Sequence, residues 1–239
     1  ARNFNNKIWN AARFVLMNLE LEEISLPDAA DLEIEDKWIL SRLNTVTKEV
    51  CDNLDHYELG IALAKLYDFV WSEFCDWYIE LLKPRFADKG SKTNVVAQNT
   101  IGYVLIGIMK LLHPYMPFIT EEIYASLPTL KAESSESIMI STYPAYKEEL
   151  SFVQDEERME KLIDLIRAIR NRRAEMNVPP SKKAQLYVVS ERSDVYNENT
   201  VRFFEKLASA SSVTYCGTVE DKTAVQIVAG GATVFIPMG

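Results

Sequence analysis

The segment that most constrains the fold runs from Glu58 to Lys83, where apolar residues recur with the period of an α-helix. Two neighbouring apolar stripes together cover about half of the helix circumference. The first stripe consists of Leu59, Leu63, Leu66, Val70, Phe74, Trp77 and Leu81, and the second of Tyr67, Trp71, Cys75, Tyr78 and Leu82. A helix with so wide an apolar face has to contact two or more neighbours. The pattern therefore predicts the central helix of a bundle, ending at Pro84.

Four more helical patterns surround this segment in the first part of the chain. They cover about residues 3–19, 36–54, 93–112 and 117–128. The links between them are short and polar, which favours antiparallel packing. The polar stretch 131–137 has no apolar periodicity, and we expect it to be a mobile link. The sequence thus predicts a mainly α fold, with an antiparallel helix bundle over residues 1–150.

The periodicity changes in the last third of the chain. Helices are predicted at about 155–176 and 194–208, and strand patterns cover 184–190, 213–216 and 223–229. Gly230 and Gly231 lie between two strand-like runs, which is typical of a two-residue hairpin. Residues 151–239 are therefore predicted to form a helix plus a small α+β unit.

The composition argues against several classes of function. The three Cys are far apart and the two His have no partners at ligand spacing, so we predict neither a disulfide framework nor a metal site. No apolar run approaches the ~20 residues of a membrane span, and we expect no membrane partner. No nucleotide-binding or hydrolase motif occurs, and we predict no catalytic residue. The chain lacks an initial Met and ends directly after a strand pattern, which is typical of a piece of a longer protein.

The segment Lys65–Pro84 also combines a thiol with four acidic residues, which raises the question of a reactive site. Cys75 falls in the apolar half of the helix, with no His nearby to lower its pKa, so we interpret it as a structural thiol. The four acids, Asp68, Glu73, Asp76 and Glu80, are predicted to lie along the solvated half. This pattern favours a structural helix over a catalytic one.

The first predicted helix is the best candidate for a binding face. Its apolar face contains Phe4, Ile8, Trp9, Ala12, Val15, Leu16 and Leu19, and the opposite face contains Asn3, Asn6, Lys7, Asn10, Arg13, Phe14 and Met17. From residue 1 to 19 there are three basic residues, with Arg2 the first, and no acid. Asn and Arg side chains can read base edges and an outward Phe14 can stack on a base, as in RNA-loop recognition. The alternative is that Phe14 packs under a neighbouring segment and the Asn side chains are only solvated.

A second basic stretch runs over residues 158–183. Helical projection places Arg170 and Arg173 on its buried face, where the apolar series ends. Either these two residues meet an anionic partner there, or they pair with acids of the bundle. Lys182 and Lys183 follow a Pro-Pro pair and could contact phosphates without reading sequence. The net charge of −9 opposes non-specific nucleic-acid binding, so any RNA contact has to come from such local basic faces.

Four segments resemble successive landmarks of the valyl-tRNA synthetases, in that family's order and over most of the chain. They read NNKIWNAARFV (5–15), VWSEFCDWYIE (70–80), LHPYMPFITEEIY (112–124) and IRAIRNRRAEMNVPPSKK (166–183). The third is also similar to isoleucyl and leucyl enzymes, and Tyr124 stands where Trp is expected. The resemblance implies the helical anticodon-binding domain of a class I aminoacyl-tRNA synthetase, followed by a linker towards a C-terminal coiled-coil arm that lies beyond these residues.

The same resemblance implies a function in tRNA recognition. A whole enzyme of this kind is cytoplasmic and charges its tRNA with valine, using ATP and Mg, in a catalytic domain of the same chain. The HIGH and KMSKS signatures of that domain do not occur here, and the editing domain is missing too, so no cofactor is expected in this part. The expected partner is the anticodon loop and stem of tRNA, contacted by Arg2, Asn3, Asn6, Lys7, Asn10, Arg13, Phe14, Arg170 and Arg173. Two alternatives are the same module of an isoleucyl- or leucyl-tRNA synthetase and a helical scaffold that binds protein.

Overall fold

A computed structural model describes residues 2–130, 133 and 135–238. The chain divides into two compact units, Ala1–Val153 and Gln154–Gly239. The first unit is helical and the second combines helices with a four-stranded sheet, which confirms the predicted mainly α bundle followed by a small α+β unit. Part of the predicted link 131–137 lies outside the described residues.

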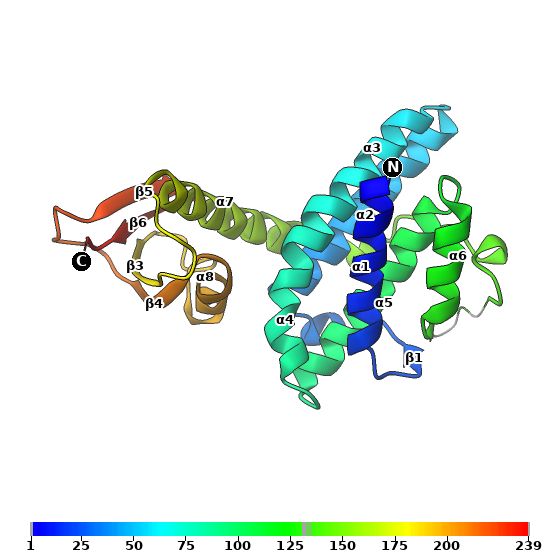
Figure 1. The fold of residues 1–239 in the computed structure, drawn as a ribbon, viewed down its shortest axis with the longest axis horizontal. Coiled ribbons are helices and arrows are strands. Elements are labelled where there is room, and N and C mark those ends of the chain that lie inside the picture. The colour runs from blue at the N-terminus through cyan, green and yellow to red at the C-terminus, as the bar shows by residue number, and fades with distance from the viewer. Residues whose placement is uncertain (1, 131–132, 134, 239) are drawn as a thin grey trace. The chain divides into compact units, whose positions relative to one another are not determined.

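The first unit is built from helices in the predicted order (Figure 1). These are α1 (Arg2–Asn18), α2 (Ile34–Asp55), α3 (Leu59–Asp68), a π-helical segment (Phe69–Tyr78), α4 (Ile79–Ala87), α5 (Lys92–Leu112) and α6 (Pro117–Ser126). Two short strands, β1 (Glu23–Ile24) and β2 (Thr129–Leu130), pair in parallel and join the link after α1 to the end of α6. Glu33 and Asp36 form a reciprocal capping box at the start of α2, and the Ser91 hydroxyl caps α5.

The central helix of the bundle is the continuous run formed by α3, the π-helical segment and α4. It contacts α1, α2 and α5, as the width of its apolar face predicts. Its buried side chains include Leu66, Val70, Phe74, Trp77 and Leu81, while Leu59, at the start of the predicted stripe, is exposed. The π-helical turns are wider than α-helical ones and occur where the aromatic residues are densest.

The predicted end of this helix at Pro84 is wrong, because α4 continues to Ala87. Pro84 cannot donate a backbone hydrogen bond, yet the turn that contains it is held from outside the helix. The side-chain amide of Asn94 donates to the carbonyl oxygens of Arg85 (3.0 Å) and Phe86 (3.4 Å). These bonds satisfy carbonyl groups that a helix end leaves open, so the helix can run past the proline.

A buried ionic cluster joins α4 to the start of α2, and sequence reasoning did not find it. The Arg85 guanidinium donates to both carboxylate oxygens of Asp36 (2.8 and 2.9 Å) and to Glu35 (3.0 Å). It also donates to the hydroxyl and carbonyl oxygens of Thr93, and the Tyr78 hydroxyl donates to Asp36 at 2.8 Å. Glu35 and Asp36 are fully buried and Arg85 is 6% exposed. The cluster therefore fixes α2, α4 and α5 relative to one another.

Helix α5 is long and strongly apolar. Contrary to the estimate from sequence, its 21 residues are long and apolar enough to cross a membrane, by length and composition alone. In the structure, 78% of the most apolar part is buried inside the protein. Its neighbours are α1, α2, α3, α4 and α6, so its hydropathy is accounted for by a position in the core of the bundle.

The second unit consists of α7, α8 and the four-stranded sheet. Its elements are α7 (Val153–Glu175), β3 (Ala184–Val189), α8 (Val201–Leu207), β4 (Ala210–Tyr215), β5 (Val225–Ala229) and β6 (Ala232–Ile236). The strand order is β4-β3-β6-β5, with β3 and β4 parallel and the other pairs antiparallel. Gly230 and Gly231 have φ of 58° and 70° and form the predicted hairpin turn. Helix α8 begins seven residues later than predicted (201 against 194), because Asn197 and Thr200 cap a 3₁₀ turn ahead of it.

Candidate nucleic-acid interface

Helix α1 is held in the bundle by one face and leaves the other face open. Its buried residues are Phe4, Ile8, Ala11, Ala12 and Val15, at spacings of three and four, and the helix contacts α5, α6 and the π-helical segment. Five of the predicted site residues, Arg2, Asn3, Asn6, Asn10 and Arg13, are exposed. The structure therefore brings two guanidinium groups and three amide groups onto one solvent-facing side of a single helix.

A shallow surface hollow runs along this side of α1. It is lined by Asn6, Trp9, Asn10, Arg13, Leu16 and Met17. Sequence reasoning placed Trp9 on the buried face, but its side chain is 36% exposed. The spacing of Trp9 could have indicated this exposure. Trp9 follows Asn6 by three residues and precedes Arg13 by four, so it is a neighbour of both on the helix surface. The hollow thus combines amide and guanidinium donors with an aromatic surface.

Lys7 lies on the same helix but is engaged within the bundle. Its ammonium group is 2.8 Å from a carboxylate oxygen of Asp76 and 4.4 Å from the ring centroid of Trp71. The ion pair and the cation–π contact both join α1 to the π-helical segment. Lys7 therefore orients the candidate face, and its charge is compensated locally.

Phe14 is half-buried and packs against the end of α4. Its ring meets Phe86 edge to face, with the centroids 5.6 Å apart, and the Lys83 ammonium group lies 5.9 Å from the Phe14 centroid. Of the two interpretations drawn from sequence, packing against a neighbouring segment is therefore present in the structure. The exposed aromatic group at the hollow is Trp9.

Arg170 and Arg173 of α7 bind backbone oxygens within the second unit. Arg170 donates to the carbonyl of Leu207 at 2.6 Å, and Arg173, 6% exposed, donates to the carbonyl of Lys182. Asn177 has φ of 57° and ends α7 with the two hydrogen bonds of a Schellman motif, from Val178 to Arg173 and from Asn177 to Ala174. The two arginine contacts connect α7 to the end of α8 and to the loop before β3, and Lys182 and Lys183 are exposed after the proline pair.

The acidic residues of the central helix are divided between ion pairs and solvent. Glu73 binds Arg42 of α2 at 2.6 Å, Glu80 binds Lys83 at 2.6 Å, and Asp76 holds Lys7, while Asp68 is exposed. Among the described residues, no group of three or more His, Cys, Asp or Glu side chains could hold a metal ion.

Cys75 is expected to react slowly with alkylating agents. Burial raises the pKa of its thiol to about 12, with Lys7 opposing the rise and Asp76 adding to it. Because the thiolate is the reactive form, iodoacetamide labelling of Cys75 in the folded protein should keep accelerating from pH 8 to pH 10. In urea the rate at pH 8 should be at least about tenfold higher, since an unfolded thiol titrates near its ordinary pKa of about 8.5. Mass spectrometry of the labelled peptide measures both rates, and equal rates would contradict a structural thiol.

Comparison with known proteins places these features in a family. The family described as "Anticodon-binding domain of tRNA ligase" matches residues 36–188, a range that begins after α1. Over its full length the chain is 47% identical to the valine–tRNA ligase of Clostridium tetani and 48% identical to that of Clostridium perfringens. It is 38% identical, over 99% of its length, to that of Bacillus cereus. The chain spans 27% of the length of each of these relatives. Since the family match covers more than half of the 239 residues, the chain belongs to the family of anticodon-binding domains of tRNA ligases.

Proposed function

We propose that this chain is the tRNA-recognition part of a cytoplasmic valine–tRNA ligase, and that the whole protein attaches valine to its tRNA with ATP and Mg. The names of the relatives support valine over isoleucine or leucine, although the relatives are much longer than the chain. In this proposal residues 1–150 bind the anticodon loop and stem. Residues 151–239 lead towards a C-terminal coiled-coil arm, and the catalytic domain is another part of the same chain.

The observation that carries the proposal is the open side of α1. Arg2 and Arg13 supply positive charge, and Asn3, Asn6 and Asn10 supply paired donors and acceptors, with no acidic residue in the helix. Unpaired bases of an RNA loop are recognised by hydrogen bonds to their edges and by stacking. Asn6, Asn10 and Arg13 flank Trp9 in the surface hollow, so both kinds of contact are available at one place. Lys7 and Phe14 support this face from within the bundle, and Arg170 and Arg173 brace the second unit.

Replacing Arg13 by Ala is expected to weaken binding of valine tRNA by roughly 1–3 kcal/mol, because the variant loses a charged donor that lines the hollow. Trp9→Ala should cost a similar amount through lost stacking. Fluorescence anisotropy with labelled tRNA measures both changes. Circular dichroism should show an unchanged helix content, since both side chains are exposed.

The matched control is Lys65→Ala, which removes one positive charge from a partly exposed position on α3, where the ammonium group lies 3.8 Å from a carboxylate oxygen of Glu49. If Lys65→Ala weakens binding as much as Arg13→Ala, the effect is one of net charge and the α1 site is disproved. A tRNA with an altered anticodon tests the same point from the RNA side. It should bind wild-type protein less tightly than valine tRNA and should be insensitive to Arg13→Ala.

A protein-binding scaffold is the second candidate, and exposed apolar side chains favour it. Leu59, Ile61 and Phe118 are 56%, 48% and 89% exposed. Salt separates the two functions, because release of counterions makes RNA binding fall steeply with ionic strength. The affinity of an apolar protein interface should change little between about 50 and 200 mM salt. Over the same range, RNA binding through several phosphate contacts should lose orders of magnitude in affinity.

A further inference from the structure

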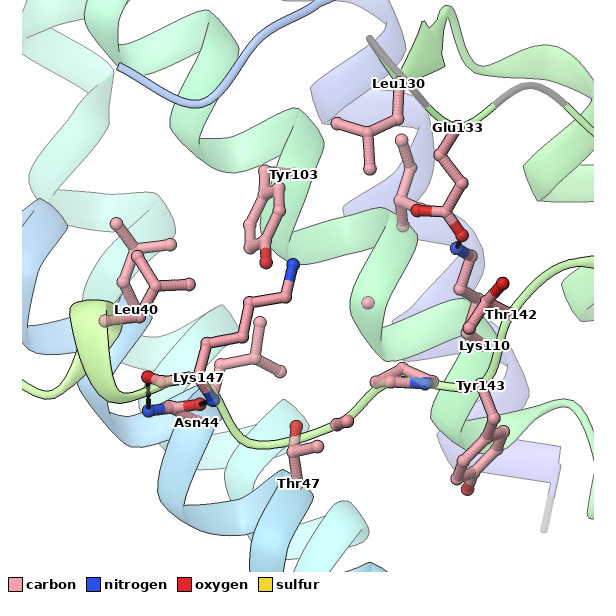
Figure 2. Close-up of a pocket in the computed structure, with 16 residues that line it drawn as sticks. Leu40, Asn44, Thr47, Tyr103, Lys110, Leu130, Glu133, Thr142, Tyr143 and Lys147 are labelled. Atoms are coloured by element: carbon pink, nitrogen blue, oxygen red, sulfur yellow. Dashed lines mark hydrogen bonds and ion pairs between the residues drawn. The ribbon is translucent and has the colours of Figure 1, made fainter. Parts of the chain in front are cut away.

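A cavity of about 330 Å³ lies between α2, α5 and the segment 142–150. Figure 2 shows its labelled side chains converging from these three elements and from Leu130 and Glu133. None of its lining residues belongs to α1, so the cavity is distinct from the hollow described above. Its volume is at the lower end of the range typical of small-molecule sites.

The wall formed by the segment 142–150 is fixed in place. The side-chain amide of Asn44 accepts from the backbone nitrogen of Lys147 (2.8 Å) and donates to its carbonyl oxygen (2.7 Å), as the dashed lines in Figure 2 show. The Tyr143 hydroxyl donates to the carbonyl of Leu111 at 3.1 Å. These three bonds join the segment to α2 and α5, so the cavity is pre-formed and a ligand loses little conformational entropy in ordering it.

The floor of the cavity is apolar, and α5 approaches α2 closely there. Gly107 lies on α5 at this point, and a Cβ atom there would come within 3.2 Å of the Leu43 side chain. Leu40, Ile106 and Leu150 complete this surface, with the ring of Tyr103 beside it. The hydroxyl groups of Thr47 and Thr142 add hydrogen-bonding capacity at the edge.

The cavity carries one positive charge that the described residues do not neutralise. Lys110 is buried and forms an ion pair with Glu133. The Lys147 ammonium group lies 5.8 Å from the ring centroid of Tyr103, and in the described part of the chain no carboxylate pairs with it. Figure 2 shows the Lys147 side chain extending into the cavity towards Tyr103. An ammonium group beside an aromatic ring and an apolar floor is complementary to a ligand that joins an anionic group to a flat body.

We propose that this cavity binds a mononucleotide unit, with the phosphate at Lys147 and the base against Tyr103 and the apolar floor. Two sources share this chemistry, namely a free nucleotide and one nucleotide of a bound RNA. The second source rests on the proposed function in tRNA recognition. The stacking surface accepts any base, since every base has a π-face, and the lysine contacts the phosphate as a point charge.

The test is an NMR titration of the chain with each of the four nucleoside 5′-monophosphates. At least one should shift the resonances of Tyr103, Gly107 and Lys147 in a saturable way. Lys147→Met and Tyr103→Leu should each weaken that binding about tenfold, because the first removes the phosphate contact and the second the stacking surface. The matched control is Lys48→Met, because the Lys48 ammonium group lies 5.7 Å from the Tyr146 ring centroid and neither residue lines the cavity. The proposal is overturned if no nucleotide shifts these resonances, or if Lys48→Met weakens binding as much as Lys147→Met.

Binding of tRNA distinguishes the two sources. If Lys147→Met also weakens tRNA binding about tenfold and the nucleotide competes with tRNA, the ligand is a nucleotide of the RNA. Unchanged tRNA affinity together with nucleotide binding assigns the cavity to a free nucleotide. If Arg13→Ala weakens tRNA binding but no nucleotide binds to the cavity, the cavity proposal is overturned and the proposed function stands. Absence of tRNA binding by the wild-type chain removes the proposed function, and the nucleotide titration still decides the cavity.

Discussion

Arg85→Met is expected to lower the free energy of unfolding of the first unit by about 3–5 kcal/mol. The substitution keeps the apolar stem of the side chain and removes the guanidinium group that contacts the carboxylates of Glu35 and Asp36 inside the cluster. Both carboxylates are fully buried, so water cannot replace the lost partner. Removing one member of a buried ion pair costs more than the pair contributes, because the remaining charge stays desolvated.

Urea unfolding, monitored by tryptophan fluorescence, measures this loss in the first unit of the chain. All four Trp residues, at positions 9, 38, 71 and 77, belong to Ala1–Val153. The matched control is Arg42→Met, which removes the 2.6 Å bond to Glu73 at a partly exposed site and should cost no more than about 1 kcal/mol. Equal losses in the two variants would show that the Arg85 cluster has no special role.

The deficit of Arg85→Met should also depend on pH. Burial raises the pKa of Asp36, and the guanidinium group of Arg85 opposes the rise. Without Arg85 the pKa of Asp36 rises further, so the folded variant takes up a proton at a higher pH than the unfolded chain. Stability gained by a raised carboxyl pKa is complete below the unfolded pKa and is lost as pH rises through the folded pKa. The deficit should therefore be smaller at pH 5 than at pH 8.

The helices of the first unit could be predicted because their apolar residues recur with a clear period. The wide face of Glu58–Lys83 gave the correct position for the central helix, since burial on several sides leaves a mark on every turn. The hairpin at Gly230 and Gly231 was also predictable, because few residues other than Gly adopt two successive positive φ angles. Both predictions depend on residues that are close in sequence.

The features that sequence reasoning missed depend on residues that are far apart. Arg85 lies 49 residues from Asp36, and charged residues beside a proline are most often solvated, so nothing local indicates burial. The parallel pairing of β3 with β4 requires a crossover, here through α8, and leaves no local signal either. The bonds from Asn94 that carry α4 past Pro84 likewise come from another helix.

The candidate interface was predictable only in part. The acid-free helix α1 could be recognised from its composition, and the exposure of Arg2, Asn3, Asn6, Asn10 and Arg13 follows from its periodicity. Periodicity placed Trp9 on the apolar face, but its side chain is 36% exposed, because it lies on the border between the two faces. The engagement of Lys7 by Asp76 depends on how α1 packs on the central helix, which the pattern of one helix does not specify.

Gly230→Ala is expected to destabilise the second unit by about 3 kcal/mol, the other large effect. Two costs add at this position. An Ala at a φ of 58° costs roughly 1–2 kcal/mol, and overpacking typically costs 1–3 kcal/mol. The new methyl group would overlap the carbonyl oxygen of Lys161 on α7 and would lie 2.7 Å from the Tyr196 hydroxyl. That hydroxyl donates to the carbonyl of Gly230 at 2.5 Å, so the turn cannot move away without breaking this bond.

Gly231→Ala separates these two costs, because Gly231 has a similar φ of 70° and its added methyl group would meet only the Arg192 side chain, at 3.8 Å. It should therefore show the backbone cost alone, about 1–2 kcal/mol. Hydrogen exchange of the β6 amide groups measures the stability of the second unit directly, since tryptophan reports only on the first. A clearly larger loss of protection in Gly230→Ala than in Gly231→Ala would show that α7 packs tightly on the hairpin. Equal losses would mean that the turn conformation alone requires glycine, and the close approach of α7 would have no energetic weight.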